Sequence, residues 1–351
     1  MHTEKRVEVL LSNFAHNTIE ELAGGNLKNI ILLGLCLMSF VGYSQTETQL
    51  YPSHLYMLDE KFTHHVIVVE KSSHQLYIYE NMNGTPRLVK SFQAATGKFK
   101  GDKVKSGDHK TPEGIYTLYD FYSQKSLLDK HGKYAEIYGS GAFPMDYPNF
   151  MDRRSRKSGG GIWLHSTDDD SRVNKGLDSR GCVVVQNADL KEISRYIELE
   201  HTPIIVVQDV HFLNKHTWEK NKAELSNFIK QWASAWQEKD FDTYIKSYSE
   251  KDFYDRSKGN FNNYKNYKKA VFARADKPQI QFDHISILNT NDYAVVTLQQ
   301  SYQSAVINDI GKKVLYLKKD ETYNWKIVGE LFNKSNAEHL AFTPSMRFFQ
   351  E

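Results

Sequence analysis

The sequence predicts two folded domains, a mainly β domain followed by an α+β domain. Its 351 residues suit about two domains on the usual length scale. In the first half, short runs rich in β-branched and aromatic residues recur between turn residues, which is typical of β-rich domains. In the second half, helical periodicity comes first and strand-like runs follow, which favours an α+β arrangement. We place the boundary near residues 208–217.

The composition narrows the class of protein. A hydrophobic share of 40% and a charged share of 25% match an ordinary globular protein. The chain carries 45 Lys plus Arg against 43 Asp plus Glu, a net charge of +2. Sequence-independent nucleic-acid binding needs a clear basic excess. We therefore expect no nucleic-acid partner.

An apolar run near the N-terminus predicts export. The run Ile30–Gly42 follows Lys28 and has about 13 residues, which suits a signal-peptide core and is short for a membrane span of about 20. Small residues at Gly42 and Ser44 place cleavage after Ser44. We assign 1–44 to an N-terminal extension and signal peptide and 45–63 to a linker, and expect a periplasmic or cell-envelope location. The rival interpretations are an uncleaved N-terminal anchor and a buried helix.

The first domain is placed at 64–208 because its strand-like runs are separated by turn residues. A Gly- and Lys-rich loop, 98–110, interrupts them. A helix is expected to start at Asn187, an N-cap type, with Asp189 in its first turn. The expected strands are His65–Glu70, Gln75–Tyr79, Leu88–Ala95, Trp163–His165, Gly181–Val185 and Ile204–Val207.

The second domain is placed at 218–332, with a C-terminal tail at 333–351. Apolar residues between Trp218 and Tyr248 recur at helical spacing, and a further helix is expected over 260–275. From residue 280 the pattern alternates, as in strands. The expected strands are 281–285, 293–298, 313–317 and 323–328.

Cysteine usage draws attention to one residue. The chain has two cysteines, Cys36 in the apolar run and Cys182. Cleavage after Ser44 leaves Cys182 alone, so an internal disulfide is excluded in the mature chain. A lone exported cysteine is a buried apolar residue, an intermolecular link or a nucleophile.

Cys182 and His165 form the candidate catalytic pair. Each lies at the end of an expected strand, where a rigid scaffold positions side chains. A thiolate is the reactive form of cysteine, and a neighbouring imidazole either accepts the thiol proton or stabilises the thiolate as imidazolium. Gly181 lets the backbone approach a substrate so that amide groups converge on an oxyanion. Arg180 adds positive potential.

The motifs around this pair resemble those of the L,D-transpeptidase catalytic domain (YkuD-type) family. They are Trp163-Leu164-His165-Ser166-Thr167, Ser179-Arg180-Gly181-Cys182-Val183 and the upstream segment Thr111-Pro112-Glu113-Gly114. The resemblance covers about 64–208 and implies a β-sandwich with short helices. The order of elements over 218–332 is similar to a nuclear transport factor 2-like cone, as in relatives of this family that are L,D-carboxypeptidases and set cell shape.

The resemblance implies a role for each matching residue. Cys182 is expected to form a thioester with a peptidoglycan stem peptide at the bond between diaminopimelate and the terminal D-alanine, and His165 to donate and accept protons. Ser179, Arg180 and Gly181 are expected to shape the substrate and oxyanion site. Val184 stands where many members carry Arg or Asn, so the substrate-orienting contact that those members make is in question here. No cofactor or metal is expected, and the oligomeric state is left open.

Other features have a structural or a functional interpretation. Asp168-Asp169-Asp170 is interpreted as a solvated loop rather than a metal site, and His64-His65 as a strand start. Lys258–Lys269 is interpreted mainly as an amphipathic helix, with a glycan site in the C-terminal domain as the alternative. The basic run Arg153–Lys157 is expected beside the cleft. The rival functions are a catalytically silent wall-binding protein and an unrelated cysteine peptidase, whose local signatures are missing.

Overall fold

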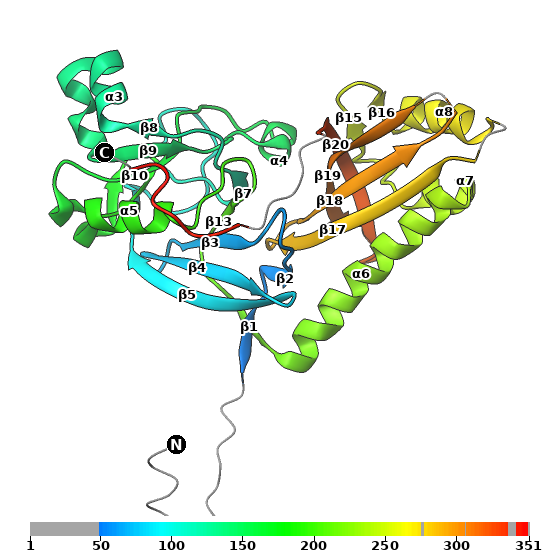
Figure 1. Cartoon of the computed structure of the whole chain (residues 1–351), viewed down its shortest axis with the longest axis horizontal. Coiled ribbons are helices and arrows are strands. Elements are labelled where there is room, and N and C mark those ends of the chain that lie inside the picture. Colours follow the sequence, from blue (N-terminus) through cyan, green and yellow to red (C-terminus); the bar gives the residue numbers. More distant parts are fainter. Residues whose placement is uncertain (1–48, 275–276, 306, 336–341, 350–351) are drawn as a thin grey trace, which may run out of the picture. The chain divides into compact units, whose positions relative to one another are not determined.

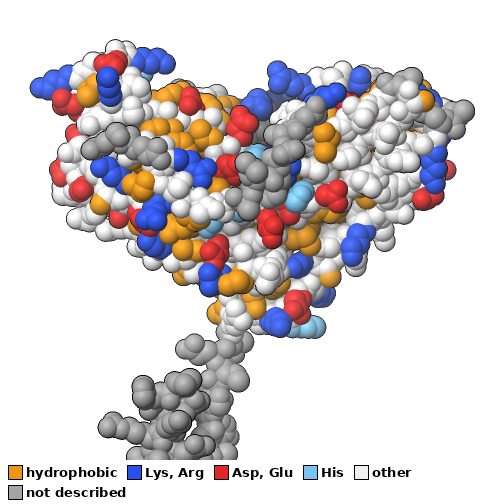
Figure 2. Space-filling model, in the orientation of Figure 1, with side chains coloured by type: hydrophobic (Ala, Val, Ile, Leu, Met, Phe, Trp, Pro, Cys, Tyr) orange, Lys and Arg blue, Asp and Glu red, His pale blue; other side chains and the backbone are white. Residues whose placement is uncertain are grey.

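The computed structural model describes residues 49–274, 277–305, 307–335 and 342–349. The predicted signal peptide and its cleavage site therefore lie outside the described residues. Within those ranges no helix has the length and apolar character needed to cross a membrane. On the face shown in Figure 2, basic and acidic side chains are interspersed, in keeping with the small net charge.

The N-terminal domain is a β-sandwich, as predicted. One sheet has five strands in the order β5-β4-β3-β13-β7 and the other has four in the order β12-β10-β9-β8. Apolar side chains from both sheets, among them Ile67, Leu76, Phe143 and Leu164, meet in one buried cluster. The strands are β3 (His65–Glu70), β4 (Gln75–Met82), β5 (Thr85–Gln93), β7 (Gly114–Thr117), β8 (Tyr122–Ser123), β9 (Gly141–Pro144), β10 (Trp163–His165), β12 (Val183–Val184) and β13 (Pro203–Val207). A further pair joins β6 (Thr96–Gly97) to β11 (Leu177–Ser179).

Short helices join these strands, and most of them could not be predicted from the sequence. They are α3 (Gln124–His131), the 3-10 turns η2 (Gly132–Tyr138) and η3 (Asp170–Lys175), α4 (Phe150–Arg154) and α5 (Asn187–Ser194). Helix α3 buries only Leu127, so it shows no apolar periodicity.

Helix α5 begins at Asn187 as predicted, but Asn187 is its first helical residue and not its cap. The N-cap is Gln186, which makes no side-chain capping bond. The Asn187 side chain is used elsewhere: its Nδ2 donates to Thr167 O at 2.7 Å and its Oδ1 accepts from Ser140 N at 2.9 Å. The capping prediction is therefore wrong because tertiary contacts recruit the amide.

The C-terminal domain is an α+β cone, also as predicted. Helices α6 (Lys215–Gln237), α7 (Phe241–Lys246) and α8 (Phe261–Phe272) come first, and four long antiparallel strands follow (Figure 1). Helix α6 lies against this sheet, and Trp232 and Tyr244 are fully buried between the helices and the strands. The strands are β17 (Gln279–Asn289), β18 (Ala294–Gln303), β19 (Asn308–Lys319) and β20 (Trp325–Lys334), with the hairpin β15 (Tyr254–Asp255) and β16 (Gly259–Asn260) beside them.

The segment predicted as a linker, 45–63, contributes strands in its described part. Strand β1 (Leu50–Pro52) pairs with β14 (Phe212–Asn214), and β2 (Leu55–Met57) pairs with β17 at the edge of the C-terminal sheet. Each has three residues, too few to show a period of two. Burial of Leu55 and Tyr56 fixes the segment in place.

The two domains share an apolar interface, and the C-terminal tail returns to the first domain. Val66, Ile205 and Val207 on the outer face of the five-stranded sheet cluster with Leu288 and Tyr316 of the C-terminal sheet. In the tail, the Phe342 ring stacks on the His64 ring with centroids 3.8 Å apart. Phe348 and Phe349 pack against Phe121.

Candidate active site

Neighbouring strands bring His165 and Cys182 to one face of the four-stranded sheet. Strands β10 and β12 run parallel, with Leu164 paired to Val183 and His165 to Val184. Leu164 and Val183 point into the sandwich core. Because successive side chains alternate between faces, His165 and Cys182 both project from the opposite face, one step to either side of that pair.

His165 is held in one tautomer. Its side chain is 4% exposed, and Nδ1–H donates to the carbonyl oxygen of Ser166 at 2.5 Å. The Tyr138 ring meets it edge-on, with centroids 5.0 Å apart. With Nδ1 carrying the proton, Nε2 presents its lone pair and can act as a base. Burial lowers the pKa of His165 to about 4, so the imidazole is neutral at physiological pH.

Cys182 is a protonated thiol in this environment. Its side chain is partly exposed, and the S–H group points to Gly161 O at 3.6 Å. Burial raises the pKa of Cys182 to about 11, although the Trp163 backbone, Arg180 and Lys103 favour the thiolate. Of the two states considered from the sequence, the structure favours a neutral thiol and imidazole over a thiolate and imidazolium.

Ser179 and Gly181 shape the turn that presents Cys182. The Ser179 hydroxyl donates to Cys182 O at 2.7 Å and accepts from Gly181 N at 3.0 Å. The Gly181 amide is therefore engaged within the turn, which leaves the Cys182 amide as the candidate oxyanion donor. Gly181 has φ +126°, and a Cβ there would lie 2.8 Å from Lys110 O. Only glycine fits this position without strain.

Arg180 lies at the rim of the site. Its guanidinium hydrogen-bonds the hydroxyl of Tyr134, a side chain that is 62% exposed. The guanidinium remains near enough to act on the pKa of Cys182. The structure thus places Arg180 near Cys182, where its positive charge favours the thiolate.

The Thr111–Gly114 motif contacts the same turn. Thr111 is fully buried; its Oγ1 accepts from Gly97 N at 2.8 Å and lies 3.5 Å from Cys182 O. Lys71, which was not predicted from the sequence, braces this segment. Lys71 Nζ donates to Thr111 O at 2.9 Å and pairs with Glu113 at 2.9 Å. Nothing in the sequence around Lys71 distinguishes it from a surface lysine.

The loop over 98–110 is ordered by one carboxylate. Asp108 pairs with Lys103 at 2.6 Å, and both side chains are buried. It also accepts from the backbone N–H groups of Val104, Lys105 and Lys110. Burial acts to raise the pKa of Asp108, but these donors hold the pKa well below its usual range. The loop is therefore a preorganised wall of the site.

Val184 is a core residue. It is fully buried with Ala95 and Val173, and its backbone exchanges two 2.8 Å hydrogen bonds with Ala95. It therefore makes no contact of the kind that Arg or Asn would make with substrate. The run Val183–Val185 is a buried strand, which agrees with the simpler interpretation of the sequence.

The acidic run after His165 has structural partners. Asp168 pairs with Arg172 at 2.6 Å, Asp169 caps η3, and Asp170 accepts from Asn187 N at 2.9 Å. Across the described ranges, no group of three or more His, Cys, Asp or Glu residues is arranged to hold a metal ion. The run is interpreted as a folded loop.

Three other sequence features occupy defined places. The pair His64-His65 lies at the start of β3, as predicted, with His64 bonded to Glu198 at 3.0 Å. The basic run 153–157 begins in the last turn of α4, and Lys157 pairs with Asp102 at 2.5 Å and Asp152 at 3.0 Å. Helix α8 is amphipathic, as predicted.

Most of the α8 aromatics cannot meet a glycan. Phe261 and Tyr264 are buried in the core of the C-terminal domain. Tyr267 is 43% exposed, with Lys258 Nζ 4.4 Å from its ring centroid. The three rings therefore do not form one exposed surface on this helix.

The sandwich with its His165–Cys182 face, followed by the cone, defines the class: an L,D-transpeptidase-type catalytic domain joined to a nuclear transport factor 2-like domain. Two family models match accordingly. Residues 64–206 match the L,D-transpeptidase catalytic domain (YkuD), and 224–331 match the Cds6 C-terminal NTF2-like domain. No curated protein shows significant similarity to the chain.

Two solved structures resemble nearly the whole described chain. Bd1075 from Bdellovibrio bacteriovorus is 32% identical, with a TM-score of 0.72, over 83% of this chain and 100% of its own. The helical cell shape determining protein Pgp2 from Campylobacter jejuni is 26% identical, with a TM-score of 0.63, over 78% and 95%. The chain belongs to the L,D-transpeptidase (YkuD) family, in a group whose catalytic domain is followed by an NTF2-like domain. This membership gives it a peptidoglycan-directed role.

Proposed function

We propose that this protein is an exported L,D-transpeptidase or L,D-carboxypeptidase that acts on tetrapeptide stems through a Cys182 thioester. The observation that carries the proposal is the juxtaposition of a thiol and a fixed imidazole on one face of neighbouring strands. A neutral thiol is a poor nucleophile, so His165 must take its proton as the attack proceeds. The neutral His165, with Nε2 unprotonated, suits that step.

The first half-reaction transfers the stem to the enzyme. His165 Nε2 accepts the Cys182 proton while sulfur attacks the carbonyl carbon of diaminopimelate. The Cys182 amide is the donor proposed for the oxyanion. The C–N bond to D-alanine then breaks, and the imidazolium gives its proton to the leaving amine. The products are free D-alanine and a thioester on Cys182.

The second half-reaction releases the stem. An amine or a water molecule attacks the thioester, His165 accepts its proton, and the proton returns to the Cys182 sulfur as the C–S bond breaks. An amine yields a cross-link and water yields a trimmed tripeptide. Cleavage of a link between wall and envelope protein would follow the same steps.

Acylation by a carbapenem tests the nucleophile. Attack of sulfur on the β-lactam carbonyl opens the ring, so intact-protein mass spectrometry should show one drug added to the wild type and none to Cys182→Ala. Alkylation of the Cys182 thiol by a general thiol reagent is a weaker test. The raised pKa of Cys182 slows that alkylation even in an active enzyme. A wild-type protein that stays unmodified under saturating drug would support the catalytically silent wall-binding alternative.

The C-terminal domain supports a second proposal, that it holds a glycan strand. An open groove of about 480 Å³ is lined by the half-buried rings of Phe228 and Trp325, with Asn227, Gln231 and Asn324 beside them. Flat rings flanked by amides suit sugars, which offer C–H faces and hydroxyl groups. This groove lies outside α8, the helix for which the sequence suggests a glycan site as the alternative.

A pull-down with sacculi tests the glycan groove. In the Cys182→Ala background, Trp325→Ala should lower the bound fraction several-fold. Tyr323→Ala is the matched control, because Tyr323 is 80% exposed and does not line the groove. Equal binding of the two variants would count against this proposal.

A further inference from the structure

The side-chain amide of Asn187 joins two separate segments of the catalytic domain. Its Nδ2 donates to Thr167 O at 2.7 Å and to Asp170 Oδ1 at 3.0 Å. Its Oδ1 accepts from Ser140 N at 2.9 Å and from Ser140 Oγ at 2.6 Å. These four bonds use both amide hydrogens and both lone pairs of the amide oxygen. The side chain therefore has no hydrogen bond left to offer a ligand.

The partners of this amide allow it only one orientation. On one side, the Thr167 carbonyl can only accept a hydrogen bond, and on the other side the Ser140 backbone N–H can only donate one. If the amide were turned over, acceptor would face acceptor and donor would face donor. Asp170 also accepts from Asn187 N at 2.9 Å, which ties the start of α5 to the same carboxylate.

The two joined segments carry the groups that contact the His165 ring. In the segment 166–170, the Ser166 carbonyl accepts a hydrogen bond from Nδ1–H of His165. In the segment 138–140, the Tyr138 ring meets the imidazole edge-on, with centroids 5.0 Å apart. The placement of the imidazole therefore depends on how these two segments are held together.

Ser166 links the same two segments from within. Its side chain is fully buried, and its Oγ accepts from Ser140 N at 2.7 Å and donates to Tyr138 O at 3.2 Å. Ser140 N is thus shared between Ser166 Oγ and Asn187 Oδ1. The Ser166 residue is held on one side by its own hydroxyl and on the other by the bond from Asn187 to Thr167 O.

The packing around Gly139 makes this junction tight. Gly139 has φ +54°, and a Cβ there would lie 2.5 Å from Asn187 Oδ1, 2.5 Å from Thr167 O and 2.6 Å from Ser166 Oγ. The three oxygens converge on a point where not even a methyl group fits. Because interiors packed this closely transmit small shifts, a displacement of the Asn187 amide also displaces Ser166.

We propose that Asn187 is a positioning residue for His165, because its amide holds Ser166 with the carbonyl group facing Nδ1. The bond from Nδ1–H to that carbonyl leaves the Nε2 lone pair free to accept a proton. In many sites a carboxylate side chain orients the histidine. Here a backbone carbonyl does so, and its direction has to be fixed by other bonds. This inference rests on the proposed function, in which Nε2 takes the Cys182 proton.

The tautomer of the His165 imidazole tests this role without any need for turnover. Long-range proton–nitrogen correlation spectra of the isotope-labelled mature chain at pH 7 distinguish a protonated Nδ1 from a protonated Nε2. The signals missing from His165→Gln identify those of His165. The wild type should show the Nδ1–H form alone. Asn187→Ala should show a mixture of the two tautomers, because the Ser166 carbonyl is no longer held in place.

Turnover of a soluble tetrapeptide is the second readout. Asn187→Ala should lower kcat about ten- to a hundred-fold, on the order of the losses seen when the group that orients a metal-binding histidine is removed. KM should stay within about two-fold, because the Asn187 amide has no bond left for substrate. Asn187→Asp keeps the size of the side chain but cannot donate to Thr167 O as a carboxylate. It should show the same changes, and it carries the test if Asn187→Ala does not fold.

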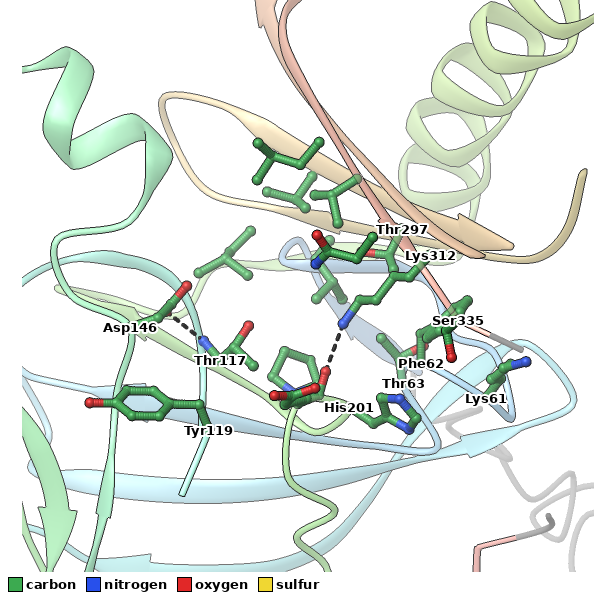
Figure 3. A pocket seen from close by; sticks show the side chains of 18 of the residues that line it. Lys61, Phe62, Thr63, Thr117, Tyr119, Asp146, His201, Thr297, Lys312 and Ser335 are labelled. Atoms are coloured by element: carbon green, nitrogen blue, oxygen red, sulfur yellow. Dashed lines mark hydrogen bonds between the residues drawn. The ribbon is translucent and has the colours of Figure 1, made fainter. Parts of the chain in front are cut away.

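Thr202→Val is the matched control. Thr202 is fully buried in the same domain, and its hydroxyl donates to Tyr196 O at 3.2 Å and accepts from Glu198 N at 2.9 Å. Its turn borders a separate cavity, where Figure 3 shows the neighbouring His201, and none of the His165 contacts named above lines that cavity. Thr202→Val should lower the melting temperature and leave the tautomer and kcat unchanged.

Three outcomes would overturn the proposal. One is a wild type whose His165 is not in the Nδ1–H form, and another is a pure Nδ1–H form in both Asn187 variants. The third is a loss of kcat in these variants no larger than that of Thr202→Val. A wild type that neither turns over tetrapeptide nor is acylated by a carbapenem would instead refute the proposed function. The tautomer would still decide the role of Asn187 in that case.

Discussion

At the scale of single residues, burial acts on His165 and Cys182 in opposite directions and keeps both neutral. It lowers the pKa of the imidazole and raises that of the thiol. The Ser166 carbonyl fixes the tautomer, a role that a carboxylate fills in many other sites. The Cys182 thiol therefore stays protonated and weakly reactive until His165 accepts its proton during attack on a substrate carbonyl.

The pH dependence of turnover follows from this state. A pKa of about 4 for His165 means that the imidazole remains a base well below the ordinary value of 6.5. We expect kcat/KM for a soluble tetrapeptide to rise through an apparent pKa near 4 and to be flat from pH 5.5 to pH 7. His165→Gln should lower kcat about 10²–10⁴-fold with an unchanged melting temperature. An acid limb near pH 6.5 would contradict a buried neutral base.

At the residue scale, the sequence singles out the candidate catalytic pair but not the residues that support it. His165 and Cys182 were recognisable because their motifs are specific. Ser179 carries a motif signature too, but the sequence could not show that its hydroxyl serves the turn. The role of Lys71 could not be predicted, because its partners are mostly backbone carbonyl groups distant in sequence.

At the scale of elements, the loop over 98–113 depends on Lys71. One buried ammonium donates to Gly101 O at 2.6 Å and to Thr111 O at 2.9 Å, and pairs with Glu113. These bonds hold the loop against the turn that presents Cys182, since Lys110 O packs on Gly181. Lys71 and Asp108 together keep this loop in place as a wall of the candidate site.

Lys71→Met is expected to destabilise this loop. Removing the ammonium leaves two buried carbonyls and a carboxylate unpaired, at a cost of about 3 kcal/mol in the free energy of unfolding. Lys175→Met is the control, because Lys175 is 60% exposed and lies 3.7 Å from Asp178, so its loss should cost less than about 1 kcal/mol. Urea unfolding at pH 7 measures both. Equal losses would show that Lys71 is not the brace.

Long elements were predictable and short ones were not. The strands of the C-terminal sheet were located because they alternate. Each runs past its predicted C-terminal bound, although β18 and β20 begin one and two residues later than predicted. Helix α6 shows clear periodicity over 23 residues. The three-residue strands β1 and β2, and the turns η2 and η3, are set by tertiary contacts that no local pattern records.

At the scale of the whole molecule, both ends of the described chain tie the domains together. Strand β2 joins the C-terminal sheet from the N-terminal side, and the tail carries Phe348 and Phe349 back to the catalytic domain. The domain order was predictable from the change of period near residue 210. The pairing of β2 with the C-terminal sheet was not predictable, because it joins residues more than 200 positions apart.

The tail should contribute to the stability of the catalytic domain. The rings of Phe348 and Phe349 are partly buried against Phe121 and Phe143. Replacing both with alanine should lower the free energy of unfolding by roughly 2–3 kcal/mol on apolar area alone. Met346→Ala is the control, since Met346 is 37% exposed and should cost less than about 0.5 kcal/mol. A double variant as stable as this control would mean that the tail is not docked in solution.

The central claim is that Cys182 and His165 act together on the stem peptides of the wall. The most direct test is to digest purified diaminopimelate-containing sacculi with the mature protein and read the muropeptide masses. We predict that tetrapeptide stems are converted into tripeptides or into cross-links between two diaminopimelates, and that Cys182→Ala leaves them untouched. Tetrapeptides that survive the wild-type protein, or that Cys182→Ala still consumes, would contradict the account.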